Sequence, residues 1–124
     1  MEDETVRGTR FEMLRDPRGF LRCTWEEGTE VGREDAQQAV AAVATLAPTL
    51  PYALLVDMRR MRRIDHEARR VFGSNTVLRR QALLIETPVS RVLANFFISV
   101  TGTAFPTRSF DDEAKAVDWL RREE

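Results

Sequence analysis

Two short, uninterrupted apolar runs constrain the fold of this chain more than any other feature of its sequence. They are Tyr52–Val56 and Ala82–Ile85, and segments with helical periodicity flank both of them. A strand that is apolar at every position is buried on both faces, which is typical of parallel strands covered by helices. The runs therefore predict an α/β domain with a mixed or largely parallel sheet.

The rest of the chain completes a ββαβαβαβα order of elements. Strand-like alternation over residues 9–15 and 20–25, on either side of the turn sequence Asp16–Gly19, predicts an N-terminal β-hairpin. Apolar periodicity of 3.6 residues predicts helices over residues 33–46, 65–72, 88–101 and 111–122. Residues 106–110 are expected to form an edge strand. Ala114, Val117 and Leu120 are expected to face inward from the last helix.

Length and composition narrow the classes of function. The 124 residues suit a single domain, which we expect over residues 9–124 after a flexible acidic arm of residues 1–8. A net charge of −1 gives no overall attraction to nucleic acid. A single cysteine, Cys23, excludes an intramolecular disulfide, and a single histidine, His66, removes most metal and acid–base sites. We therefore expect no metal, no cofactor and no catalytic residue.

The sequence also shows no pattern typical of a signal peptide or a membrane-spanning segment. The acidic start of the chain lacks the features of a signal peptide. The longest apolar stretch, Val92–Val100, is interrupted by Asn95 and Ser99 and is too short to span a bilayer. We expect a cytoplasmic protein without integral membrane association.

Two segments resemble the STAS domains, the SpoIIAA-like fold of anti-sigma-factor antagonists. In those domains a hydrophobic strand ends in Asp and an Ile-Asp pair opens a helix, as in Leu54–Met58 and Ile64-Asp65 here. The C-terminal stretches Pro88–Phe97 and Pro106–Asp111, with Trp119-Leu120, are similar to bacterial STAS/SEC14-like proteins of unassigned function. The resemblance covers about residues 9 to 122. It implies a mixed sheet with packed helices and a protein that works by docking to partners.

The chain departs from the family pattern at the start of this helix. In the anti-sigma antagonists a phosphorylatable Ser follows the helix-opening Asp, which corresponds to Asp65 here. His66 occupies the position of that Ser, and Glu67 and Ala68 replace small residues. The serine switch is absent, so a kinase-controlled role is not expected.

Basic residues are concentrated in one part of the chain. Residues 58–80 hold eight Arg against Asp65 and Glu67, a net charge of +6. The arginines of the first loop in this segment suggest a patch for a phosphate, an acidic partner or nucleic acid. The candidate residues for binding a protein partner are Asp57, Arg59, Arg62, Arg63, Asp65, His66 and Arg69. The structural alternative is that the arginines pair with acidic segments, that Asp57 fixes a loop and that His66 is an exposed first-turn residue. No aromatic residue is interleaved with the basic loop at 59–63, and no nucleic-acid-binding motif is visible.

Thr87 as N-cap and Pro88 in the first turn predict the start of a helix. The helix expected after Pro88 is apolar on more than one side. Its inward stripe is expected to comprise Val89, Val92, Leu93, Phe96, Phe97 and Val100. Ala94 and Ile98 then lie on a second face, where a surface helix should carry charge. Ala94, Phe97 and Ile98 are therefore candidates for self-association as a homodimer, or for ligand binding. The alternative is a helix covered within its own domain.

Three classes of function follow from these observations. The first is a non-enzymatic, STAS-like interaction module that binds a protein partner or itself. The second is a SEC14-like carrier of a small molecule or lipid, suggested by Phe96, Phe97, Ile98 and Phe105. The third is a small hydrolase or transferase, which would need a closed cavity lined by Asp57 and His66.

Overall fold

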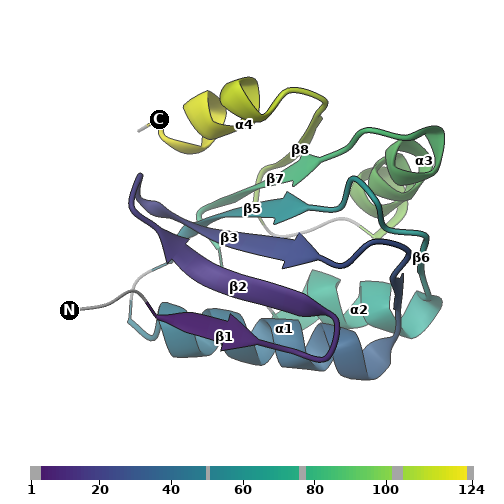
Figure 1. Cartoon of the computed structure of the whole chain (residues 1–124), viewed down its shortest axis with the longest axis horizontal. Coiled ribbons are helices and arrows are strands. Elements are labelled where there is room, and N and C mark those ends of the chain that lie inside the picture. Colours follow the sequence, from purple (N-terminus) through teal and green to yellow (C-terminus); the bar gives the residue numbers. More distant parts are fainter. Residues whose placement is uncertain (1–3, 50, 76–77, 102–104, 123–124) are drawn as a thin grey trace.

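A six-stranded mixed sheet with helices on both faces forms the body of the protein (Figure 1). The computed structural model describes residues 4–49, 51–75, 78–101 and 105–122. The spatial order of the strands is β1-β2-β3-β5-β7-β8. Their bounds are Thr5–Arg7, Phe11–Asp16, Phe20–Trp25, Ala53–Asp57, Arg80–Leu84 and Thr107–Phe110. The predicted α/β fold with a mixed sheet is confirmed.

The sheet has an antiparallel part and a parallel part. The strands β1, β2 and β3 are antiparallel neighbours, whereas β3, β5, β7 and β8 run parallel to one another. The predicted hairpin joins β2 to β3 through a turn in which the Gly19 N–H donates to the Asp16 carbonyl over 2.9 Å. Gly19 has a φ of 106°, a backbone conformation that favours glycine.

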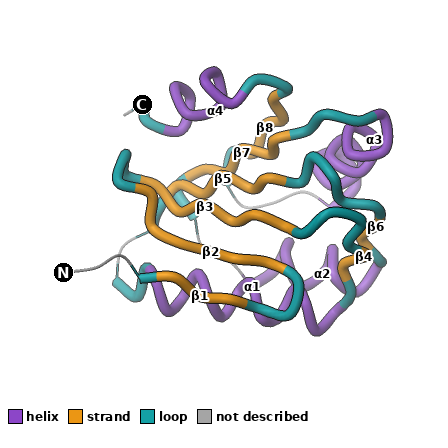
Figure 2. Tube along the Cα trace, viewed as in Figure 1, coloured by secondary structure: helices purple, strands orange, loops and turns teal. Residues whose placement is uncertain are grey.

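The helices that connect the parallel strands all cover one face of the sheet. This is because the strands β3, β5, β7 and β8 follow one another across the sheet in a single direction. Right-handed crossovers then place each connection on the same side of the sheet. These connections are α1 (Arg33–Leu46), α2 (His66–Asn75) and α3 (Pro88–Phe96), which continues into the π-helical turn η1 (Phe97–Thr101). After β8 the chain turns to the opposite face, which α4 (Glu113–Leu120) covers (Figure 2).

Alternating side chains of the two central strands supply two separate cores. Every residue of β5 and β7 is buried, as the two apolar runs predict for β5 and for most of β7. Leu54, Val56 and Leu83 pack beneath α1, α2 and η1. Leu55 and Leu84, on the other face, pack against α4.

Several local expectations are wrong. Residues 5–7, assigned to a flexible arm, form β1 and pair with β2, while residues 1–3 lie outside the described ranges. No strand was expected in the loops that follow β3 and β5. Each loop contains a short strand, β4 (Glu30–Val31) and β6 (Arg63–Ile64), and the two strands pair as a small parallel sheet. Helix α2 continues through Gly73 to Asn75, beyond the expected end at residue 72.

Helix α4 also differs from the expectation. Its cap is Asp112, whose Oδ1 accepts from the Lys115 N–H, and its inward residues include Ala116 and Trp119. Ala114 is exposed. The helix begins later than the pattern suggested; Val117 and Leu120 are buried as expected, and Ala116 and Trp119 complete the buried face.

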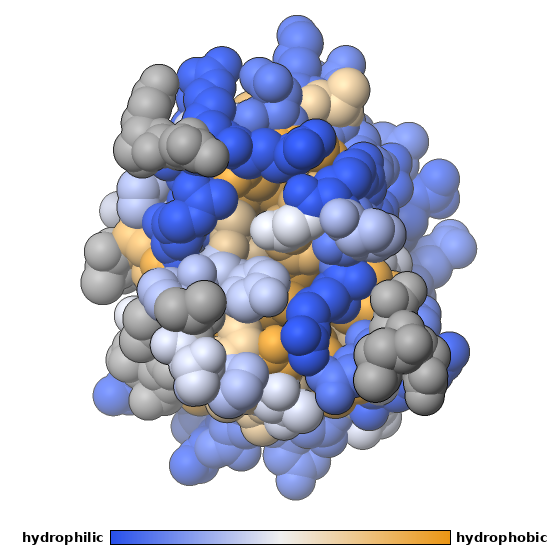
Figure 3. Space-filling view, turned by 90° about the vertical axis from the view of Figure 1, so that its left-hand side faces the viewer, coloured by the Kyte–Doolittle hydropathy of each residue, from blue (hydrophilic) through white to orange (hydrophobic). Residues whose placement is uncertain are grey.

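The two ends of the sheet differ in the polarity of the residues around them. Strand β1 begins and helix α4 ends at the end of the sheet where the parallel strands begin, and Figure 3 views the molecule from that side. Hydrophobic residues are visible at the centre of that view, with hydrophilic residues around them. The opposite end, where β3, β5 and β7 terminate, carries the polar groups described next.

Candidate functional site

A polar hollow of about 380 Å³ lies where the parallel strands end. It is lined by Thr24, Trp25, Asp57, Arg59, Arg60 and Glu86. These residues come together because Thr24 is paired with Asp57 across β3 and β5, and Asp57 is paired with Leu84 across β5 and β7. Open α/β sheets commonly bind ligands at such carboxyl edges.

Asp57 organises the loop that leaves β5. Its side chain is buried, and its Oδ1 accepts hydrogen bonds from the Arg59 backbone N–H and Nε at 3.2 and 3.0 Å. The Arg59 Nη2 donates to Oδ2 over 2.7 Å. This is the loop-fixing role that the structural alternative for Asp57 described.

The neighbours of Asp57 keep its carboxylate charged. Burial alone would raise the pKa of Asp57, but the Arg59 hydrogen bonds and the charges of Arg59 and Arg22 outweigh it, so the pKa lies below its ordinary value. Arg22 Nη2 stands 3.6 Å from Asp57 Oδ2, and its Nη1 pairs with Glu113 Oε2 at 2.8 Å. The charges at this edge are therefore matched by other residues of the protein.

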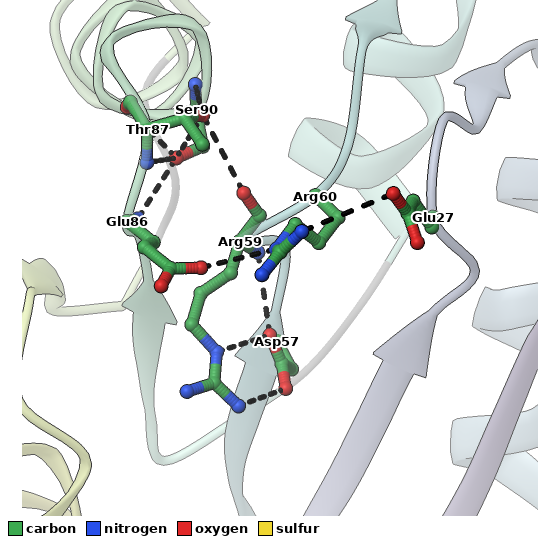
Figure 4. A network of polar contacts seen from close by, with 7 residues as sticks. All are labelled: Glu27, Asp57, Arg59, Arg60, Glu86, Thr87 and Ser90. Carbon is green, nitrogen blue, oxygen red and sulfur yellow. Dashed lines mark hydrogen bonds and ion pairs between the residues drawn. The ribbon is translucent and has the colours of Figure 1, made fainter.

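A second polar cluster ties the loop after β5 to the start of α3 (Figure 4). Arg60 Nε donates to Glu86 Oε1 over 3.1 Å, and its Nη1 lies 3.8 Å from Glu27 Oε2. Thr87 Oγ1 accepts from the Ser90 N–H and donates to the Arg59 carbonyl. Ser90 Oγ accepts from the backbone N–H groups of Glu86 and Thr87. The N-terminus of α3 is thus capped by its own residues, as Thr87-Pro88 predicted.

The seven candidate partner-binding residues fall into separate groups. Asp57 and Arg59 form the pair just described, and Arg62 lies on the surface with Nε 3.7 Å from Glu30. Arg63 is exposed on the short strand β6. The structure does not gather these arginines into one patch.

The other three candidates belong to α2. Asp65 precedes the helix, and its Oδ1 accepts from the Ala68 N–H over 2.8 Å, which confirms it as the N-cap. His66, the first helical residue, is exposed. Arg69 donates to the Ile64 carbonyl and places its guanidinium 4.5 Å from the centre of the Phe96 ring.

Helix α3 packs with a different face from the one expected, although Leu93 and Phe97 of the expected inward stripe do contact the core. Val89, Val92 and Phe96 are 50%, 64% and 41% exposed, although the sequence pattern assigned them to the core. Ala94 and Phe97, assigned to self-association, are buried beneath the helix, and Ile98 packs against the same core. Those three residues therefore form no exposed surface for a second copy.

Small side chains explain this orientation. Ser90 and Ala94, four residues apart, are both fully buried, and their size lets the helix backbone approach the sheet. Phe97, three residues further, continues the same buried line. The i, i+4 spacing of Ser90 and Ala94 is the sequence signal that could have identified the exposed residues Val89, Val92 and Phe96.

A partly open apolar cavity of about 50 Å³ is lined by residues of the larger core. Residues of the sheet, of α1 and α2, and Phe97 of η1 line it. Phe97 is thus a cavity residue, whereas Ala94 and Ile98 do not line it. Neither Asp57 nor His66 contributes to this cavity.

Two further features were searched over the described part of the chain. No three His, Cys, Asp or Glu side chains there are grouped so that they could hold a metal ion. None of the described helices combines the length and the apolar character needed to cross a membrane.

One protein-family model matches most of the chain. A family described as "Domain of unknown function (DUF7793)" matches residues 13–124. A search of curated proteins found no match.

Two solved structures were compared with this chain. An uncharacterised DUF3478-family protein with a SpoIIAA-like fold, from Shewanella loihica PV-4, is 16% identical, with a TM-score of 0.57. The match covers 96% of this chain and 92% of that one, and confirms the expected SpoIIAA-like fold. A protein of unknown function from Arthrobacter sp. FB24 is 33% identical, with coverages of 90% and 99% and a TM-score of 0.35.

Proposed function

This chain belongs to the DUF7793 family of unknown function, and we propose that it is a non-enzymatic interaction module that binds a protein partner on α3. The partner segment is short and amphipathic, with apolar side chains for α3 and carboxylates for the neighbouring arginines. The proposal keeps the class of function expected from the sequence and moves the contact surface to the exposed face of α3.

The exposed apolar strip of α3 carries this proposal. Among the described residues, the exposed large hydrophobic side chains are Val89, Val92 and Phe96. Single exposed apolar residues are ordinary on protein surfaces, but these three follow one another along one helix face. Such a strip supports contact with another molecule.

The charge beside the strip indicates the chemistry of the partner. The segment with a net charge of +6 brings a guanidinium to the strip through Arg69, which lies over the Phe96 ring. Arg59 contacts Thr87 through its carbonyl oxygen, and its own guanidinium is paired with Asp57. Arg91, on α3 itself, is also exposed, with its Nη2 3.9 Å from Asp111 Oδ2. A partner with acidic residues around an apolar centre complements this arrangement.

The size of the strip favours a short segment over a second copy of the chain. A nine-residue helix is about 13.5 Å long and roughly 10 Å wide. Its face is therefore much smaller than the ~800 Å² per partner buried in a typical stable interface. A homodimer through α3 is an alternative outcome of the test below.

The other two classes of function receive less support. The apolar cavity of about 50 Å³ is well below the roughly 300–1,000 Å³ of drug-sized ligand pockets, which argues against a lipid carrier. His66 is exposed and does not line the hollow that contains Asp57, which argues against an acid–base pair of these two residues.

The test compares capture of a partner by matched surface variants. Val92→Asp places a charge in the strip, and Ala44→Asp does the same at an exposed position of α1. We expect the wild type and Ala44→Asp to capture one acidic partner from the native cell, and Val92→Asp to lose it. Calorimetry with the purified partner must give the same ranking.

Two results would contradict the proposal. Equal binding by Val92→Asp in a natively folded sample would remove α3 from the contact. Sedimentation of the wild type as a dimer that Val92→Asp dissociates would assign the strip to a second copy of the chain.

A further inference from the structure

The exposed apolar side chains of α3 follow the spacing at which helices pack against one another. Val89, Val92 and Phe96 stand three and four residues apart, so about 4.5 Å and 6 Å separate them along the helix axis. Two helices that lie side by side meet through residues at this spacing. At the next position of the pattern, Ser99 is polar and donates its hydroxyl to the Asn95 carbonyl. The strip therefore offers a partner about two turns of contact.

An extended partner segment would fit this surface poorly. Such a segment adds to the edge of a sheet, because its backbone N–H and C=O groups need hydrogen-bond partners. The backbone groups of α3 are used within the helix, and the Thr87 and Ser90 hydroxyls accept from N–H groups at its start. Side chains on one face of a strand also repeat about every 6.7 Å, which does not match the step from Val89 to Val92. A helical partner repeats the same steps and satisfies its own backbone.

The arginines beside the strip differ in their partners. Arg69 of α2 places its guanidinium 4.5 Å from the centre of the Phe96 ring, and its Nη1 donates to the Ile64 carbonyl. It forms no ion pair with a carboxylate in the described part of the chain. Arg91 Nη2, by contrast, lies 3.9 Å from Asp111 Oδ2. Arg69 is therefore the guanidinium that a carboxylate of the partner can engage at the strip.

We propose that the partner binds α3 as an amphipathic helix of about three turns, with apolar side chains three and four residues apart and a carboxylate that reaches Arg69. This inference rests on the proposed function and specifies the conformation of the partner and its acidic contact. Helices that dock on protein surfaces use apolar anchors at this spacing. The apolar and the charged contact meet at Phe96, where the Arg69 guanidinium lies on the ring.

The probe is a phage-displayed library of random peptides of about 16 residues, which is enough for four helical turns. The library is selected on the wild type and depleted on Val92→Asp, which places a charge in the exposed strip. We expect the enriched peptides to carry apolar residues three and four positions apart, together with Asp or Glu. Proline at the centre of an enriched peptide should weaken binding at least tenfold, whereas proline at its first residue should leave binding intact.

The acidic contact is tested on both molecules. Arg69→Gln should weaken an enriched peptide about threefold, because exposed ion pairs contribute little, and replacing the acid of the peptide by its amide should remove that difference. Arg63→Gln, at an exposed arginine of β6, is the matched control and should leave the affinity unchanged. If Arg69→Gln does not fold, the peptide decides: its amide form should bind the wild type about threefold more weakly than its acid form.

Three results would overturn the inference. Enriched peptides with apolar residues at every second position, unaffected by a central proline, would replace the helix by an extended partner and leave α3 as the docking surface. Equal affinity of the acid and amide peptides for the wild type would remove the contact with Arg69. A selection that yields no Val92-dependent peptide would remove the docking surface itself, and the proposed function with it.

Discussion

The guanidinium of Arg59 closes on the carboxylate of Asp57, two residues earlier, through bonds of 3.0 Å from Nε and 2.7 Å from Nη2. The pair sits at the carboxyl edge of the sheet, where a ligand-binding protein would keep such groups available. Here both charges are used to hold the loop that leads toward α2. The same loop contacts the start of α3 through the Arg59 carbonyl. The Asp57–Arg59 pair thus positions the proposed docking surface.

Asp57→Asn should lower stability in a pH-dependent way. The folded-state pKa of Asp57 lies below its unfolded value, so its contribution is complete above the unfolded pKa and disappears as pH falls through the folded pKa. Urea unfolding at pH 7 should show a loss of about 1–3 kcal/mol. The difference from the wild type should shrink below about pH 4. A difference that is the same at pH 7 and pH 3 would contradict this assignment.

Cys23 should resist thiol reagents until the protein unfolds. The side chain is buried, and burial, together with the nearby charge of Asp57, raises the pKa of its thiol. The thiolate is the reactive form, so modification at pH 8 requires opening of the core. Mass spectrometry should show labelling that follows the unfolding transition in urea. Rapid labelling of the native protein would contradict the burial.

The two sides of α3 should respond differently to substitution. Ala94→Leu inserts atoms into a packed interior and should destabilise the protein by about 1–3 kcal/mol. Val92→Ala, on the exposed strip, should change stability by less than about 0.5 kcal/mol. Chemical denaturation of both variants measures the contrast. Similar losses would mean that the strip is covered within the domain.

Arg69 and Phe96 should be energetically coupled. The guanidinium lies 4.5 Å from the ring centre, and exposed cation–π pairs contribute about 0.5–1 kcal/mol. A double-mutant cycle with Arg69→Met and Phe96→Leu isolates this coupling from the bond between Arg69 and the Ile64 carbonyl. Additive losses would show that the two side chains do not interact in solution.

The start of α2 should depend on Asp65 and not on His66. Removing the N-cap acceptor with Asp65→Ala should lower the free energy of unfolding by about 1 kcal/mol. His66→Ala should change it by less than about 0.5 kcal/mol, because the histidine is exposed. A loss above ~2 kcal/mol in His66→Ala would mean that its side chain has a partner.

Local chemistry was enough to predict much of the fold from the sequence. Continuous apolar runs predicted the buried strands, because β5 and β7 have both faces covered. Thr87-Pro88 and Asp65 predicted helix starts, because their side chains satisfy N–H groups only a few residues away. Loop fixing was one of the two interpretations of Asp57, again because it involves only groups a few residues away in the sequence.

Contacts between distant segments decided the rest. Helix α3 has two apolar faces, so its periodicity identifies a helix without selecting the side that packs on the sheet, and the small residues Ser90 and Ala94 take that side. Strand β1 forms because the edge of β2 is available to pair with it. The apolar cavity likewise depends on side chains from the sheet and from several helices meeting around it. Local sequence determines where the main helices and the buried strands form, whereas burial summed over the whole fold determines which faces remain exposed and which short segments pair at the edges.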